Sequence, residues 1–148
     1  MAHVAFNQLL PEVAKKETRS IILPAINQFG IPAGTYVFLE LYCDDLSCDC
    51  RNVYIYVLNA QTNTTEATIT YGWERLKFYM DWMGIDDKND QMIKDFKGPA
   101  LYAFGEQRSH ANKWLTIFKD ILKSDKDYAN RLQRHYQLVK ASIEHKNK

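Results

Sequence analysis

The stretch TYVFLELYC at residues 35–43 is followed by NVYIYVL at residues 52–58, and both stretches alternate between two kinds of side chain. Aliphatic residues occupy every second position and aromatic residues occupy most positions between them, which is the period of a β-strand. An antiparallel register with Leu39 opposite Ile55 keeps like faces together. The two stretches therefore predict a hairpin with one aliphatic face and one aromatic face, the latter carrying Tyr36, Phe38, Tyr54 and Tyr56.

The spacing of apolar residues outside this hairpin predicts the other elements. Further strands are expected at residues 20–23 and 67–71, and helical spacing begins at Trp73. Helices are expected at residues 73–83, 91–96 and 109–122 and from residue 125 almost to the C-terminus, with Asp90, Ser109 and Asp125 as N-caps. This order predicts an α+β fold: an antiparallel sheet of three to four strands, helices packed on one side, and a helical C-terminal half.

Composition is that of one globular domain spanning residues 1–148. The chain is 46% hydrophobic and 25% charged, and its length is sufficient for a core without disulfides. A net charge of +1 argues against a protein that binds polyanions over its whole surface. No apolar run approaches the length of a membrane span, and no basic leader precedes the first apolar stretch, so we expect a cytoplasmic protein without membrane contact.

All three cysteines lie in CDDLSCDC, at residues 43–50. Cytoplasmic thiols stay reduced, and clustered soft thiolates favour zinc or iron–sulfur chemistry. Cys48 and Cys50 can point the same way from extended backbone, and Cys43 stands across the mouth of the hairpin, opposite Arg51 in the expected register. The cluster predicts a zinc site with Cys43, Cys48 and Cys50 as ligands. A structural zinc site needs a fourth ligand from elsewhere in the chain.

His135 is the first candidate for that fourth ligand. It lies between Leu132 and Val139 on the apolar stripe of the last helix, so its imidazole is expected to face inward, where a metal would satisfy it. Packing this helix on the sheet would bring it to Cys43. His110 is the second candidate, and a water molecule is the third, whereas His3 and His145 lie near the chain ends.

Two other interpretations of the cysteines stay open. They can be ordinary or redox-sensitive thiols, or one of them, Cys50, can be a nucleophile. The acidic neighbours Asp44, Asp45 and Asp49 raise thiol pKa values, which disfavours a nucleophile, and they favour an incoming cation. A site with three protein ligands and a water would permit metal-dependent catalysis, so enzymatic activity is left undecided.

Charge and aromatic residues suggest a third function. Residues 123–148 hold seven Lys or Arg and three acidic residues, for a charge of +4. Cations on the last helix beside an aromatic sheet face would suit a single nucleic-acid strand. We consider this interpretation weaker, because helices must bury their apolar stripes and the aromatic sheet face is the natural place. The cations concerned are Lys126, Arg131, Arg134 and Lys140.

The helix expected at residues 73–83 is apolar on both sides. Leu76, Met80 and Met83 lie on one side, and Phe78 and Trp82 lie on the other. The helix is therefore either enclosed within the domain, which we favour, or it uses Phe78 and Trp82 to contact a protein partner or a second copy of the chain.

Three runs, YCDDLSCDCRNV (residues 42–53), ETRSI (17–21) and RLQRHY (131–136), resemble a bacterial family of uncharacterised proteins. That family has a YC-x4-CDCR cysteine hairpin and a C-terminal RLxRHY helix. The resemblance implies that Cys43, Cys48, Cys50, Arg51 and His135 belong to the family signature, and it implies no activity. The leading prediction is a metal-binding structural or interaction module.

Overall fold

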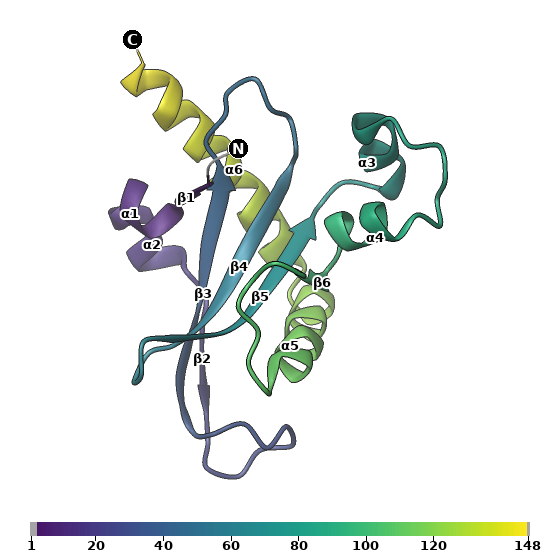
Figure 1. The fold of residues 1–148 in the computed structure, drawn as a ribbon. Coiled ribbons are helices and arrows are strands. Elements are labelled where there is room, and N and C mark those ends of the chain that lie inside the picture. The colour runs from purple at the N-terminus through teal and green to yellow at the C-terminus, as the bar shows by residue number, and fades with distance from the viewer. Residues whose placement is uncertain (1–2, 148) are drawn as a thin grey trace.

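The computed structural model describes residues 3–147, which form a six-stranded antiparallel sheet and six helices (Figure 1). The strands are β1 (His3–Ala5), β2 (Ser20–Leu23), β3 (Gly34–Cys43), β4 (Asn52–Asn59), β5 (Thr64–Gly72) and β6 (Ala100–Leu101). The helices are α1 (Phe6–Leu9), α2 (Pro11–Glu17), α3 (Leu76–Met83), α4 (Gln91–Lys97), α5 (Ala111–Ser124) and α6 (Lys126–Lys146). The predicted α+β class and the helical C-terminal half are confirmed.

A meander of β3, β4 and β5 forms the middle of the sheet, and β6 pairs with β5. Both β1 and β2 pair with β3 on its other side: β2 with its beginning, and β1 with its end, where His3 lies opposite Cys43. The sheet is larger than expected because β1 and β6 are too short to show a period-two pattern. Their three and two residues pair only because longer strands stand beside them.

The register between β3 and β4 is shifted by one residue from the predicted one. Leu39 pairs with Tyr56, and Phe38 pairs with Val57. One sheet face thus combines the rings of β3 with the aliphatic side chains of β4, since both sets pack against the same helices. The prediction of a single aromatic face is wrong, because Tyr36 and Phe38 lie on the helix-covered face and Tyr54 and Tyr56 lie on the other.

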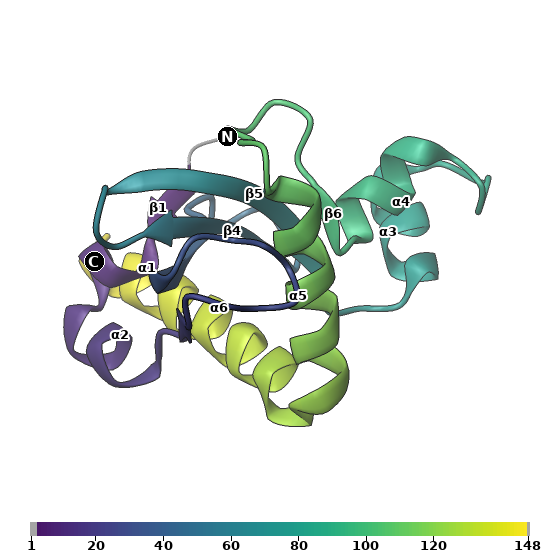
Figure 2. The same ribbon diagram turned by 90° about the horizontal axis from the view of Figure 1, so that it is seen from below.

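Helices α5 and α6 cover one face of the sheet, as Figure 2 shows. Phe38 lies on that face and packs against α5. The ring centroid of Trp114 lies 4.6 Å from that of Tyr36 and 6.0 Å from that of Phe38. Phe118 packs on Phe38 from the next turn of α5, and Phe38 is fully buried. This burial confirms that helices cover Phe38, and it removes that ring as a stacking surface for nucleic-acid bases.

Two of the three predicted helix caps are present. Asp90 accepts hydrogen bonds from the backbone N–H groups of the first turn of α4, and Asp125 accepts one from Asp127 N–H in α6. Ser109 is not a cap, because α5 begins two residues later and its N-cap is His110, which forms no side-chain cap bond.

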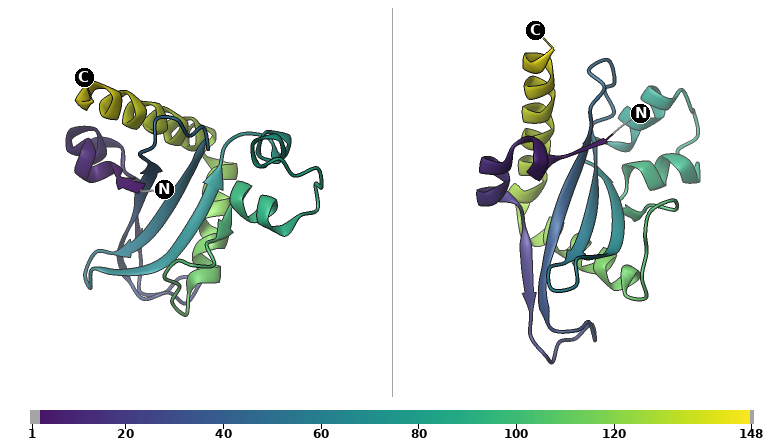
Figure 3. Two further views of the ribbon diagram at one scale, coloured as in Figure 1. Left: turned by 45° about the horizontal axis from the view of Figure 1, so that its top comes forward. Right: turned by 60° about the vertical axis from the view of Figure 1, so that its left-hand side comes forward.

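Figure 3 shows α3 and α4 beyond β5 and α1 and α2 at the opposite edge. Within residues 3–147, no helix is both long and apolar enough to cross a bilayer.

Phe78 and Trp82 of α3, which suggested contact with a partner, each contact another residue of the chain. The Arg51 guanidinium lies 4.5 Å from the ring centroid of Phe78, and Trp82 stacks on Phe96 at 5.4 Å. Trp82 keeps 37% of its surface exposed. Contact with a protein partner through these residues stays a prediction.

Candidate metal centre

The three cysteines meet where the loop of residues 44–51 joins β3 to β4. Their Sγ atoms all lie within 4.8 Å of one another, although the residues span eight positions of the chain. Cys43 and Cys50 are buried and Cys48 is half-buried. The cluster therefore has the composition and compactness to hold one metal ion.

The spacing of the sulfur atoms is close to that of a tetrahedral zinc site. With Zn–S bonds of about 2.3 Å, two thiolates of a tetrahedron lie about 3.8 Å apart. The sulfur atoms, at no more than 4.8 Å, need to approach one another by no more than about 1 Å. Rotation about the side-chain χ1 angles supplies displacements of this size without moving the strands.

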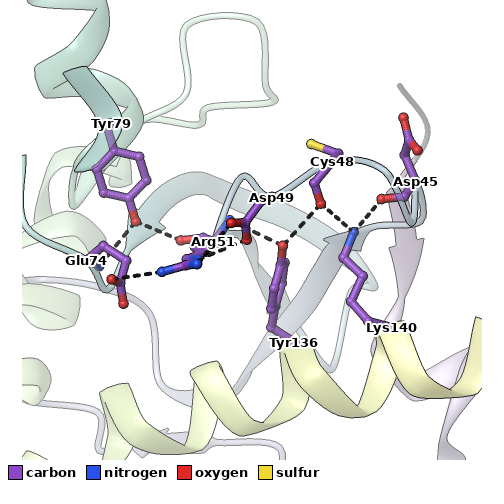
Figure 4. A network of polar contacts seen from close by, with 8 residues as sticks. All are labelled: Asp45, Cys48, Asp49, Arg51, Glu74, Tyr79, Tyr136 and Lys140. Atoms are coloured by element: carbon purple, nitrogen blue, oxygen red, sulfur yellow. Dashed lines mark hydrogen bonds and ion pairs between the residues drawn. The ribbon is translucent and has the colours of Figure 1, made fainter. Parts of the chain in front are cut away.

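Residues of α6 hold the backbone of the loop, as Figure 4 shows. Lys140 Nζ donates hydrogen bonds to the carbonyl oxygens of Asp45 at 2.7 Å and Cys48 at 3.3 Å. The Tyr136 hydroxyl also donates to the Cys48 carbonyl, at 3.5 Å. Within the loop, Cys48 N–H donates to the Asp45 carbonyl at 3.1 Å. These bonds fix the path of the chain on both sides of the Cys48 thiol.

The backbone after Cys50 is strained and is held from two sides. Arg51 has a φ of 46°, in the left-handed region that side chains with a Cβ rarely adopt. Its carbonyl accepts a 2.7 Å hydrogen bond from the Tyr79 hydroxyl of α3, and its N–H donates to the Tyr136 hydroxyl of α6 at 3.4 Å. Gly72 leaves room for Tyr79, since a Cβ there would lie 2.1 Å from the hydroxyl oxygen. Such strain persists where surrounding contacts enforce it, as at many functional sites.

The charged groups around the loop partly offset one another. The Arg51 guanidinium binds both carboxylate oxygens of Asp49 at 2.9 Å and one oxygen of Glu74 at 3.3 Å (Figure 4). Asp49 is thus paired, and its charge adds little to that of the thiols. Lys140 is the cation whose field acts on the thiols, lowering the pKa values of Cys43 and Cys50 against stronger opposing effects.

The net effect on both buried thiols is a raised pKa. Burial is the main cause, and the neighbouring sulfur atoms add to it, so the pKa of Cys50 rises to about 12. Burial also raises the pKa of Cys43. Both are therefore neutral thiols near pH 7, which argues against Cys50 as a nucleophile. A metal that binds here must displace protons, and its charge would then stabilise the thiolates.

His135 does not join the cysteines. Its Nδ1 lies 2.6 Å from an oxygen of Glu40, and its Nε2 lies 2.9 Å from an oxygen of Glu17. The imidazole is fully buried, as its position on the apolar stripe predicted, and it stacks on Phe6 with ring centroids 4.1 Å apart. Glu40 and Cys43 are three residues apart in β3 and point to opposite faces. Helix α6 packs on the Glu40 face, so both nitrogens of His135 are occupied away from the sulfur atoms.

His110 lies at the other end of the sheet. The start of α5 is tied to the beginning of β5, where Arg108 N–H donates to the Glu66 carbonyl. The cysteines adjoin the opposite end of β5, because Asn52 pairs with Gly72. Glu66 and Gly72 are roughly 20 Å apart at the rise of a strand, so His110 is too distant to serve as a ligand.

His3, which is not among the ligands predicted from the sequence, lies close to the cysteines. It pairs with Cys43 across β1 and β3, and its ring stacks on Tyr54 with centroids 4.4 Å apart. His3, Cys50, Asn52 and Tyr54 line one cavity of about 210 Å³. Burial lowers the pKa of His3, which favours the neutral imidazole. Three residues of strand carry no readable periodicity, so no local signal pointed to this histidine.

No protein-family model, curated protein or solved structure matches the chain. The fold and the site therefore define the protein by class, as an α+β domain with a three-cysteine cluster that can hold a metal. Its resemblance to a bacterial family with a cysteine hairpin stays a prediction.

Proposed function

We propose that the protein is a zinc-binding structural or interaction module whose metal is held by Cys43, Cys48 and Cys50. The observation that supports it is the approach of the three Sγ atoms to within 4.8 Å of one another. Zinc suits this cluster better than an iron–sulfur centre, because such clusters are usually held by four cysteines and the chain contains three.

The charge balance of the site also supports zinc. Three thiolates around Zn²⁺ leave one negative charge, and the Lys140 ammonium lies on the carbonyls of the same loop. Its field stabilises the thiolate form of Cys43 and Cys50. A metal bound here would close the loop of residues 44–51, so that the free energy of metal binding would add to that of folding.

Zinc analysis of the purified protein tests this proposal. Protein kept reduced, incubated with Zn²⁺ and desalted should retain about one zinc per chain. Cys48→Ser and Cys50→Ser should each lose it. Ser47→Ala is the matched control, because Ser47 is exposed in the same loop and should leave the zinc content unchanged. A zinc content near zero in parent protein with reduced, unmodified thiols would contradict the proposal.

A metal-dependent enzyme is the rival from another class, and coordination number separates the two. Four protein ligands close a zinc site, whereas three ligands and a water leave a position where chemistry can occur.

Nucleic-acid binding has less support from the structure than from the sequence pattern, because Tyr36 and Phe38 are buried under α5.

A further inference from the structure

We propose that His3 is the fourth ligand of this metal and that the closed site ties β1 to the β3–β4 hairpin. The inference rests on the proposed metal site and deepens it. A Cys3His donor set is a standard structural zinc site, and it would remove the open position that catalysis needs.

Strand pairing places His3 beside the cysteines. His3 lies directly opposite Cys43 in the antiparallel pair of β1 and β3, so the two side chains project from the same sheet face. Opposed residues have Cβ atoms about 4.5–5.5 Å apart, which an imidazole spans easily. A ring nitrogen can therefore reach a metal bound to the Cys43 sulfur without a shift of either strand.

A cavity lined by both His3 and Cys50 leaves space for the His3 imidazole to move toward the metal. His3 and Cys50 both line the 210 Å³ cavity, together with Asn52. In the structure the ring rests on Tyr54, and its nitrogens lie outside the group of atoms within 4.8 Å. Ligation thus requires the imidazole to leave the Tyr54 ring by rotation about its side-chain bonds.

The other histidines of the described chain are placed less favourably. Both nitrogens of His135 bind carboxylates, and His110 lies at the far end of β5. His145 is exposed near the end of α6. A neutral imidazole also adds no charge to three thiolates and Zn²⁺, whereas a further carboxylate would increase the negative excess.

A metal held in this way would control the attachment of β1. Within residues 3–147, three residue pairs join β1 to β3, from His3–Cys43 to Ala5–Leu41. A short edge strand of this kind opens readily unless something else holds it. Metal removal should therefore increase hydrogen exchange at residues 3–5, while the central strand β4 stays protected.

Cobalt titration of three proteins tests the assignment, since the ligand-field bands of Co²⁺ report the number and type of its donors. The parent and His145→Ala should bind Co²⁺ tetrahedrally with equal affinity. His3→Ala should bind it about 100-fold more weakly or worse, because loss of a hydrogen-bonding partner outside the ligand shell already costs 10–100-fold. Free imidazole added to His3→Ala should restore the parent spectrum, which a purely structural role would not produce.

A second measurement needs no variant. In parent protein, an imidazole nitrogen of His3 should show the NMR shift of a metal-bound nitrogen on addition of Zn²⁺. Parent-like affinity and spectrum in His3→Ala, or an unshifted His3 resonance in protein that holds zinc through its cysteines, would overturn the assignment and leave the proposed function intact. Failure of the parent to bind Co²⁺ or Zn²⁺ would instead refute the metal site itself.

Discussion

The two faces of the sheet hold two polar clusters of opposite character. Under α6, the buried imidazole of His135 is placed between Glu40 and Glu17, and Glu40 also accepts a 2.7 Å hydrogen bond from the Tyr42 hydroxyl. On the other face, the end of β3 and the loop that follows it bring together the sulfur atoms of Cys43 and Cys50, with His3 on the neighbouring strand. The first cluster joins an imidazole to carboxyl groups, whereas the three cysteines of the second are groups of one kind.

This difference separates a cluster that stabilises the fold from one that is suited to bind a ligand. Each nitrogen of the His135 ring lies within hydrogen-bond distance of a carboxyl oxygen, of Glu40 or of Glu17, so the chain itself supplies the partners of the imidazole. The cysteine cluster instead raises the pKa values of its own members through burial and mutual proximity. Thiols that raise one another's pKa values ionise together when a bound cation stabilises their thiolate forms. A metal ion would supply that charge at the cysteine cluster.

The largest expected effect tests the assignment of the two faces. Phe38→Ala should lower the free energy of unfolding by about 3–5 kcal/mol, because Phe38 is fully buried under α5. Tyr56→Ala should cost about 1 kcal/mol, because Tyr56 lies half-buried on the other face. Urea unfolding measures both losses. Equal losses would mean that the two rings share a face, which would contradict the pairing of Phe38 with Val57.

The second prediction separates the two clusters. His135→Ala should lower the free energy of unfolding by about 3 kcal/mol, because it leaves a cavity under α6 and removes the hydrogen-bond partner of a buried Glu40 oxygen. Its zinc content should equal that of the parent. Unfolding curves and zinc analysis of the same preparation check both parts. Loss of zinc with stability retained would show that His135 belongs to the metal site after all.

A smaller effect is expected where α3 meets the loop. Tyr79→Phe removes the hydroxyl that donates to the Arg51 carbonyl and accepts from Glu74 N–H. The loss should cost about 1 kcal/mol and weaken zinc binding moderately, because the strained turn after Cys50 loses a support. Competition with a chromophoric chelator measures the zinc affinity. Tyr56→Phe is the control, and an equal loss of affinity in that variant would contradict the role given to Tyr79.

The smallest effect concerns acid stability. Hydrogen bonds from Arg134 and then His135 lower the pKa of Glu17 to about 2 from its ordinary value of 4.5. A lowered folded-state pKa contributes stability that is present above the ordinary value and is lost as the pH falls toward 2. The free energy of unfolding should therefore decline between about pH 5 and pH 2, and Glu17→Gln should flatten that decline. A parallel decline in both proteins would exclude Glu17 as its source.

Long periodic segments and short spacings were predictable from the sequence. Alternation located β3 and β4, helical spacing located α5 and α6, and three cysteines within eight residues indicated one cluster. Each of these predictions rests on residues that are close in the sequence, and the geometry of the backbone between them limits how they can be arranged.

The register and the fourth ligand depend on tertiary packing, which the local pattern does not contain. Alternation in β3 and β4 fits two registers that differ by one residue, and the packing of α5 and α6 selects between them. Helix α6 packs on the sheet face that carries Glu40, so His135 contacts Glu40, whereas Cys43 lies on the opposite face. The proximity of His3 to Cys43 depends on a three-residue strand that forms only against β3.

X-ray absorption at the zinc edge of the zinc-loaded protein tests the central claim most directly, because it counts the donor atoms around the metal. We expect three sulfur atoms at about 2.3 Å and one nitrogen at about 2.0–2.1 Å. Three sulfur atoms with an oxygen in place of the nitrogen would retain the cysteine site and reject His3. A shell of nitrogen and oxygen without sulfur would contradict the cysteine centre altogether.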